Sequence, residues 1–207
     1  MKLIRQYFPQ FSDEQIQQFQ HFHDLIIEWN EKINLISRKN IDEVESQHLL
    51  HSLAIAKVMA FKGGTKVLDV GTGGGFPGIP LAIAFPNVSF TFVDSIQKKI
   101  NAVRDMVIRL ELKNVKVISG RAENVPGKFD FVTARAVART DKLVGWTKKK
   151  FNKKPSGNEL ANGYLLLKGG DLTEELDEAY LPYVTHSIAK MYTDDFFETK
   201  YVVYLAK

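Results

Sequence analysis

Cysteine is absent from all 207 residues, and no apolar run approaches the length of a membrane-spanning helix. The first absence excludes disulfides, thiolate metal sites and cysteine nucleophiles. It therefore also excludes the RNA methyltransferases that modify pyrimidine C5 through a cysteine adduct. The second absence, together with the lack of a stretch resembling a signal peptide, predicts a cytoplasmic protein without membrane association.

The composition is that of an ordinary globular protein, with 44% hydrophobic and 25% charged residues. The length suits one domain, or one domain with a small extension, and is sufficient to bury a full core. A net charge of +4 permits binding to nucleic acid without requiring it. Five lysines crowd residues 148–154; such a run forms either a solvated loop or a phosphate-binding patch beside the active face.

The most informative stretch is residues 66–80, KVLDVGTGGGFPGIP. A short, β-branched apolar run predicts a buried strand. Its glycines follow at once, at Gly71, Gly73, Gly74, Gly75 and Gly78. Glycine accepts a positive φ and allows a ligand to approach the backbone, and the prolines at 77 and 80 suit the first turn of a helix. Strand, turn and helix together predict a nucleotide pocket at the carboxyl end of a parallel sheet.

Two features decide which nucleotide this pocket would bind. The spacing Gly73-x-Gly75-x-x-Gly78 satisfies the dinucleotide fingerprint, which keeps an NAD-linked oxidoreductase as an alternative. Asp69 would meet the ammonium-bearing half of S-adenosyl-L-methionine (AdoMet) but would repel a pyrophosphate. The bulky Phe76 also stands where dinucleotide folds need a close backbone approach. We therefore predict an AdoMet pocket that includes Asp69, Gly71, Gly73, Gly75 and Phe76.

The remaining pattern predicts two parts. Residues 1–62 form a helical extension packed on the core, with a capping box at Ser12 and Gln15 and a second helix at 41–60. Residues 63–207 alternate strands and helices, as a class I AdoMet-dependent methyltransferase of Rossmann-like fold does. The predicted strands are 66–70, 89–94, 116–119, 129–134 and 163–168, followed by a terminal antiparallel hairpin at 184–192 and 199–206. The sheet is therefore expected to be mostly parallel, with an antiparallel C-terminal strand.

Several residues follow the predicted strands. Asp94, 23 positions after Gly71, suits the ribose hydroxyls, or caps the next helix. Ala122 and Glu123 stand where AdoMet enzymes contact adenine, Ala122 through its backbone N–H. Arg135 and Lys168 would bring cations to the active edge for an anionic substrate such as RNA phosphate.

One motif is absent after the fourth strand. The segment 133–138 lacks the Asn/Asp-Pro-Pro-aromatic sequence with which exocyclic amines are methylated. The pair His48 and His51 offers two imidazoles to a metal, but AdoMet chemistry needs none. One of the two is instead expected to line the substrate cleft or to fill the helix–sheet interface.

The chain resembles the RsmG family, also called glucose-inhibited division protein B, over roughly residues 25–170. The segments that carry the resemblance are WNEKINL at 29–35, HLLHSL at 48–53, VLDVGTGGGFPGIP at 67–80, DS at 94–95, RAVA at 135–138 and KG at 168–169. The resemblance implies that Gly71, Phe76, Ala122, Glu123 and Arg135 contact AdoMet. It places Lys32, His48, Lys98 and Lys168 on the RNA-facing side. Many members have Asp where this chain has His51, so that position receives no role.

The resemblance implies an enzyme that methylates N7 of a guanine in 16S rRNA, acting on the RNA or the small ribosomal subunit, with AdoMet as cofactor and no metal. Guanine N7 carries a free lone pair, so no general base is needed, and the sequence offers no obvious one. Arg135, Lys168 and His48 are the candidates for positioning the substrate. A methyltransferase of another RNA or of a small molecule is the second interpretation, and a monomer is expected.

Overall fold

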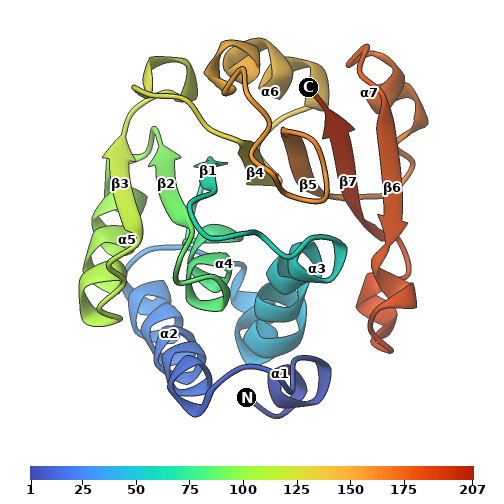
Figure 1. Ribbon diagram of the computed structural model, residues 1–207. Coiled ribbons are helices and arrows are strands. Elements are labelled where there is room, and N and C mark those ends of the chain that lie inside the picture. Colours follow the sequence, from blue (N-terminus) through green and yellow to red (C-terminus); the bar gives the residue numbers. More distant parts are fainter.

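A seven-stranded sheet forms the middle of the molecule in the computed structural model (Figure 1). The structure describes the backbone of residues 1–207 and the side chains of residues 1–37 and 41–207. The strands are β1 (Lys66–Val70), β2 (Ser89–Asp94), β3 (Val115–Ser119), β4 (Phe131–Arg135), β5 (Gly163–Gly169), β6 (Tyr183–Ser187) and β7 (Lys200–Ala206). Their spatial order is β3-β2-β1-β4-β5-β7-β6, and β7 runs antiparallel to both neighbours. The prediction of a mostly parallel sheet with an antiparallel C-terminal strand is confirmed.

Helices cover both faces of this sheet. They are α1 (Lys2–Tyr7), α2 (Asp13–Lys32), α3 (His51–Val58), α4 (Gly78–Ala84), α5 (Gln97–Arg109), α6 (Thr140–Thr147) and α7 (Thr173–Asp177). Figure 1 shows α1 to α5 on one side of the sheet, and α6 and α7 on the other. Each side has its own apolar core. None of the helices in the described part of the chain is long and apolar enough to cross a membrane.

The start of α2 is fixed to α4. Ser12 and Gln15 form the expected capping box, which satisfies backbone donors that the first turn leaves unpaired. The Gln15 amide also donates to the carbonyls of Ile83, at 2.8 Å, and Ala84, at the end of α4. One side chain therefore serves two helix ends, and the N-terminal helices lie directly on the sheet's helical layer.

The prediction of one α-helix over residues 41–60 is wrong in detail. The segment begins as a 3₁₀ turn (Arg38–Glu43), widens to a π-helical stretch (Val44–Leu50) and becomes regular only in α3. Within the π-helical stretch, Glu45 accepts the backbone N–H groups of Leu3, at 2.9 Å, and Ile4. This contact holds α1 in place, and it joins residues more than 40 positions apart, beyond the reach of local periodicity.

The crossover from β3 to β4 differs from the other crossovers between parallel strands. It contains only a 3₁₀ turn, Ala122–Asn124, whereas α4, α5 and α6 occupy the others. The side of the sheet that carries α6 and α7 is therefore not covered by a helix of this crossover. The terminal hairpin also differs from expectation, because β6 ends at Ser187 and the following residues turn as a 3₁₀ segment (Ile188–Lys190).

The lysine-rich segment at 148–154 lies at the amino end of the central strands. Phe151 bridges to Phe129, which precedes β4, and Asn152 donates to Asp130 at 2.7 Å. The expected pocket stands at the opposite, carboxyl end of β4. The alternative interpretation, a phosphate-binding patch beside the active face, is therefore wrong about the position of these lysines.

Candidate functional site

The glycine-rich turn after β1 has a shape that side chains would prevent. Gly71, Gly73 and Gly75 all have positive φ, at 62°, 57° and 90°. A Cβ on Gly71 would lie 2.5 Å from a methyl carbon of Val137, and one on Gly75 would lie 2.6 Å from Ile79. Conformation and space both require glycine here, so the chain passes close beneath the loop that follows β4.

Asp94, the last residue of β2, connects two turns of the site. One carboxylate oxygen accepts the N–H of Gly73 at 3.0 Å, and the other accepts the N–H of Ile96 at 2.8 Å. Ile96 is the residue from which α5 starts. The carboxylate therefore braces the glycine turn and the backbone that leads into α5 at the same time, while each oxygen keeps a lone pair for a ligand hydroxyl.

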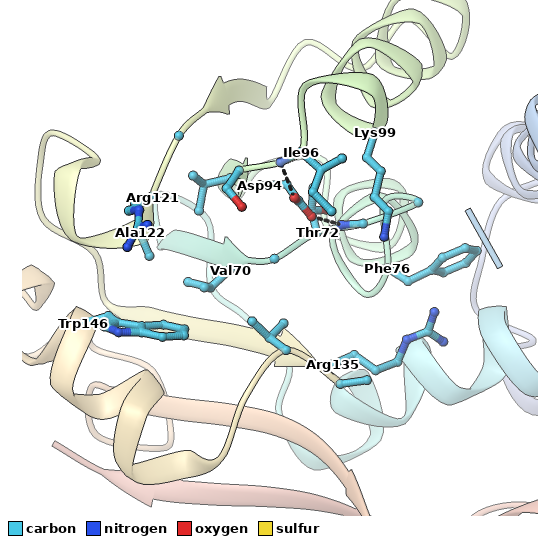
Figure 2. A pocket seen from close by; sticks show the side chains of 18 of the residues that line it. Val70, Thr72, Phe76, Asp94, Ile96, Lys99, Arg121, Ala122, Arg135 and Trp146 are labelled. Carbon is cyan, nitrogen blue, oxygen red and sulfur yellow. Dashed lines mark hydrogen bonds between the residues drawn. The ribbon is translucent and has the colours of Figure 1, made fainter. Parts of the chain in front are cut away.

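A cavity of about 540 Å³ opens at this carboxyl edge. That volume is typical of sites for cofactors and other small molecules. Seven of the predicted site residues line it: Gly71, Gly73, Phe76, Asp94, Ala122, Glu123 and Arg135. Figure 2 shows Ala122 and Trp146 at one end of the cavity and Phe76, Arg135 and Lys99 at the other. The structure thus brings together residues that lie far apart in the sequence.

The Phe76 end combines a cation with aromatic rings. The Arg135 guanidinium lies 4.7 Å from the centre of the Phe76 ring, and the His48 ring lies 5.2 Å from it. Both nitrogens of the buried His48 lack a hydrogen-bond partner among the described side chains. Burial, assisted by the charge of Arg135, lowers the pKa of His48 to about 3, so the imidazole is neutral. Burial also lowers the pKa of Arg135 to about 10, which leaves it protonated at neutral pH.

Besides His48, three other predicted residues do not line the cavity: Gly75, Asp69 and Lys168. Gly75 belongs to the glycine turn, but it lies next to Ile79 of α4 and not on the cavity wall. Asp69 is fully buried and accepts the Thr133 hydroxyl at 2.8 Å, so its carboxyl is part of the sheet's interior and not of the cavity wall. Burial raises the pKa of Asp69 to about 7.

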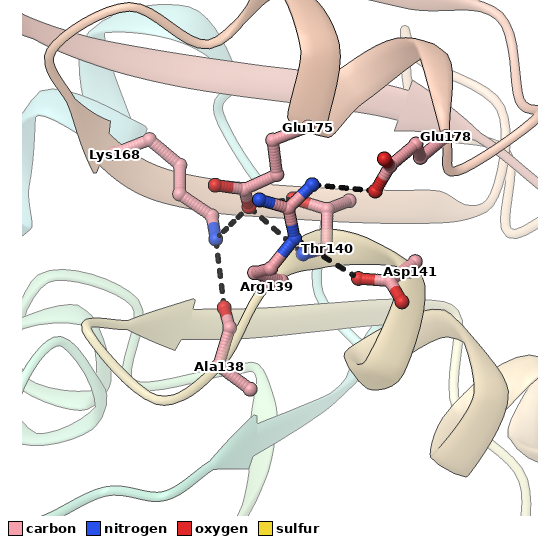
Figure 3. Close-up of polar contacts among 7 residues, drawn as sticks. All are labelled: Ala138, Arg139, Thr140, Asp141, Lys168, Glu175 and Glu178. Carbon is pink, nitrogen blue, oxygen red and sulfur yellow. Dashed lines mark hydrogen bonds and ion pairs between the residues drawn. The ribbon is translucent and has the colours of Figure 1, made fainter.

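Lys168, the third of these residues, is held within a polar network (Figure 3). Its amine donates to the Glu175 carboxylate at 2.6 Å and to the Ala138 carbonyl at 2.9 Å. Glu175 also accepts the backbone N–H of Thr140 at 2.8 Å. The lysine charge is thereby compensated, and the network fixes the loop between β4 and α6. That loop forms one wall of the cavity through Val137.

Sequence reasoning missed several lining residues, of which Trp146 is the most informative. It belongs to α6, a helix absent from the predicted elements, and it lies near Ala122 at the end of the cavity away from Arg135 (Figure 2). Its side chain is 37% exposed. A tryptophan beside a glycine in a polar segment was the available signal. Ile96, Lys99 and Arg121 also line the cavity and follow predicted strands or open predicted helices.

The other candidates from the sequence, Lys32, Lys98 and His51, do not line the cavity. Lys32 pairs with Glu28 at 2.9 Å and lies over the Trp29 ring. His51 packs edge-on against Phe196 and Phe197, and burial lowers its pKa well below the ordinary value. Outside the side chains of residues 38–40, no group of three or more His, Asp or Glu residues is arranged to hold a metal ion.

Sequence comparison identifies close relatives. The model of the family described as rRNA small subunit methyltransferase G matches residues 15–200. A protein named Ribosomal RNA small subunit methyltransferase G from Cytophaga hutchinsonii is 50% identical over 205 residues, covering 99% of each chain. A protein of the same name from Flavobacterium johnsoniae is 54% identical over 206 residues, covering 99% of this chain and 97% of its own.

Solved structures share the fold at much lower identity. A SAM dependent methyltransferase from Aquifex aeolicus superposes with a TM-score of 0.58 at 20% identity, covering 82% of this chain and 98% of that one. Aeropyrum pernix fibrillarin, solved with natively bound S-adenosyl-L-methionine, gives a TM-score of 0.54 at 15% identity and 74% coverage of both chains. These similarities establish the fold alone.

Proposed function

Because the chain belongs to the rRNA small subunit methyltransferase G family, we propose that it transfers the methyl group of AdoMet to N7 of a guanine in 16S rRNA. The observation that carries the proposal is the cavity at the carboxyl edge of the sheet. A glycine turn and the Asp94 carboxylate form its wall, and a protonated arginine stands at one end. The relatives are named for the methylation of small-subunit ribosomal RNA.

The lining residues suit the parts of AdoMet in order. The free lone pairs of the Asp94 carboxylate suit the ribose hydroxyls. Ala122, Glu123 and Trp146 would receive the adenine at one end, the indole offering a face for stacking. The backbone of the glycine turn would receive the methionine portion. When bound, AdoMet would supply an electrophilic methyl group on a sulfonium, and Phe76 and Arg135 would line the end of the cavity that receives the methionine portion.

The Phe76 end has the chemistry that a guanine needs. N7 carries its own lone pair, so the site needs to orient the base and not to deprotonate it. Arg135 is fixed over Phe76 and can donate to the guanine O6, which neighbours N7. The neutral His48 lies behind Phe76 and offers no acid or base at neutral pH. Positioning of this kind contributes roughly 7–11 kcal/mol in favourable reactions.

The decisive experiment is a transfer assay with tritiated AdoMet. Small ribosomal subunits, or their RNA, would come from a strain that lacks the enzyme, and subunits from the unmodified parent strain serve as the already methylated control. We expect labelled 7-methylguanosine in the digest of the first sample and little label in the second. AdoMet binding without label in rRNA would overturn the substrate and direct the search to another RNA or a small molecule. A melting temperature raised by NAD and not by AdoMet would overturn the cofactor.

We also propose that the protein acts as a monomer in the cytoplasm, where small subunits are available. The exposed Ile96 and Trp146 belong to the cavity, which accounts for part of the exposed apolar surface. Light scattering on the purified protein, alone and with AdoMet, should give a mass near 23.5 kDa. A stable mass of twice that value would contradict the monomer.

A further inference from the structure

Lysines gather at the amino end of the sheet, on the side opposite the cavity. The five lysines of residues 148–154 are joined there by Lys66, Lys128 and Lys207; we refer to these eight as the amino-end lysine patch. The Lys128 amine donates to the Lys149 carbonyl, and the Lys207 amine donates to the Asn152 carbonyl at 3.2 Å. Hydrogen bonds between separate segments therefore bring the lysines to one place.

The patch is built onto the fold and is not a loose loop. Backbone bonds of 2.8 Å join Phe129 to both Lys150 and Asn152, on either side of the Phe129–Phe151 bridge. The Asn162 amide donates to the carbonyl of Lys154 at 2.9 Å. Buried Phe151 anchors the segment to the core beside Tyr164. The lysine side chains thus project from a fixed backbone.

The positive charge of the patch is not compensated. Within the described side chains, none of the eight lysines forms an ion pair with a carboxylate. The Asp130 carboxylate, buried beside them, is occupied by the Lys66 N–H and the Asn152 amide. The patch gathers eight of the chain's 28 Lys and Arg residues.

We propose that the amino-end lysine patch binds phosphates of the RNA at a place separate from the nucleotide that is methylated. The inference rests on the proposed function and extends it to the class of substrate. A strand of five residues spans about 16 Å, so the patch and the cavity lie on opposite ends of the sheet. A short single-stranded RNA placed in the cavity would not reach the amino-end lysine patch, whereas a folded RNA or an assembled particle presents phosphates to both ends of the sheet. Clustered lysines supply the salt-dependent part of such binding.

The test uses a triple variant, Lys148→Gln, Lys153→Gln and Lys154→Gln. The amines of these exposed lysines support no backbone carbonyl among the described residues, unlike those of Lys128 and Lys150. The matched control removes the same charge at scattered, exposed positions: Lys2→Gln, Lys113→Gln and Lys190→Gln. The probe is the purified small ribosomal subunit from a strain lacking the enzyme, and its affinity for each variant is measured at several salt concentrations.

We expect the patch variant to bind the subunit about tenfold more weakly near physiological salt. Its slope of log Kd against log salt should fall by about 0.7–0.9 for each phosphate that the lysines no longer neutralise. AdoMet affinity and kcat at saturating subunit should match the wild type, while KM rises. The control should stay within about twofold of the wild type, since unclustered charges add little local potential.

Equal weakening in the patch variant and the control, or wild-type affinity in the patch variant, would overturn the proposal. Because binding is measured without methyl transfer, failure of the proposed function gives a different result. Subunits that bind with a patch-dependent salt slope but accept no methyl group would support the patch and overturn the reaction.

Discussion

The cations at the carboxyl ends of β4 and β5 have opposite surroundings. Lys168 lies near the end of β5, and the Glu175 carboxylate compensates its charge. The lysine amine also donates a hydrogen bond to the Ala138 carbonyl. Arg135 ends β4 over an aromatic ring, and no carboxylate lies within ion-pairing distance of it among the described side chains. The sequence predicts a cation at the active edge at both positions, yet only Arg135 lines the cavity.

This difference distinguishes a cation that stabilises the fold, Lys168, from one that is available to a ligand, Arg135. A partly buried charge without a counterion costs folding free energy, and proteins keep such groups mainly where a ligand needs them. A charge that is paired and hydrogen-bonded fixes the backbone around it. We therefore expect changes at Arg135 to affect methyl transfer, and changes at Lys168 to affect stability first.

The largest effect is expected for Arg135→Met, which removes the cation but keeps an apolar side chain of similar length. Loss of one donor aimed at a reacting group typically costs about 10²–10³-fold in kcat. The unfolding free energy should be unchanged or higher, because an uncompensated charge is removed. Methylation of small subunits and denaturant unfolding give the two values. Normal methylation with reduced stability would reverse the comparison.

Lys168→Met should lower the unfolding free energy by about 1–3 kcal/mol, because it leaves the Glu175 carboxylate partly buried without its counterion. The double variant Lys168→Met with Glu175→Leu should recover much of the loss, since no unpaired charge is left. Urea unfolding of both variants measures this coupling. Full stability in the single variant, with methylation abolished, would place Lys168 with Arg135 in the chemistry.

Asp69→Asn tests whether the buried carboxyl compensates Arg135. Burial raises the pKa of Asp69 in the folded protein to about 7, above its ordinary value of 3.8. Below about pH 4 the carboxyl is protonated in both the folded and the unfolded protein, and the free energy of unfolding has its full value. As the pH rises from about 4 toward 7, the unfolded protein loses this proton more readily, and the free energy of unfolding falls. The variant should lose this part of the pH dependence and gain roughly 1–2 kcal/mol relative to the wild type at pH 8. A variant that is less stable at pH 8 would show that ionised Asp69 supports Arg135.

The smallest effect is expected at the other end of the cavity. Trp146→Ala should raise the Kd for AdoMet about three- to tenfold through the loss of an aromatic face, with little change in kcat. A Trp29→Phe variant leaves Trp146 as the sole tryptophan, and its fluorescence should change on AdoMet binding. If the fluorescence and the affinity were both insensitive, the indole would have no contact with the cofactor.

The sequence was sufficient for the turn after β1 and for the order of the strands of the sheet, because both follow from local composition. Gly71 and Asp94 act through the backbone conformation and bonds that their residue types predict. The pairing of Lys168 with Glu175 could not be predicted, since it depends on where the short helix α7 docks. Trp146 was missed for a related reason: α6 is only two turns long and has no side-chain cap among the described residues.

The apolar core on the N-terminal side extends from Ile4 in α1 to Tyr204 in β7 without interruption. Phe22 of α2 touches Phe76 of the glycine turn, with ring centres 5.2 Å apart. Melting should therefore be a single cooperative transition in calorimetry, because the helical extension and the sheet share this one core. A chain beginning at Gly63 would expose the apolar surfaces of α4 and the glycine turn to water. We therefore expect the boundary visible in the sequence to mark a change of pattern within one cooperative unit.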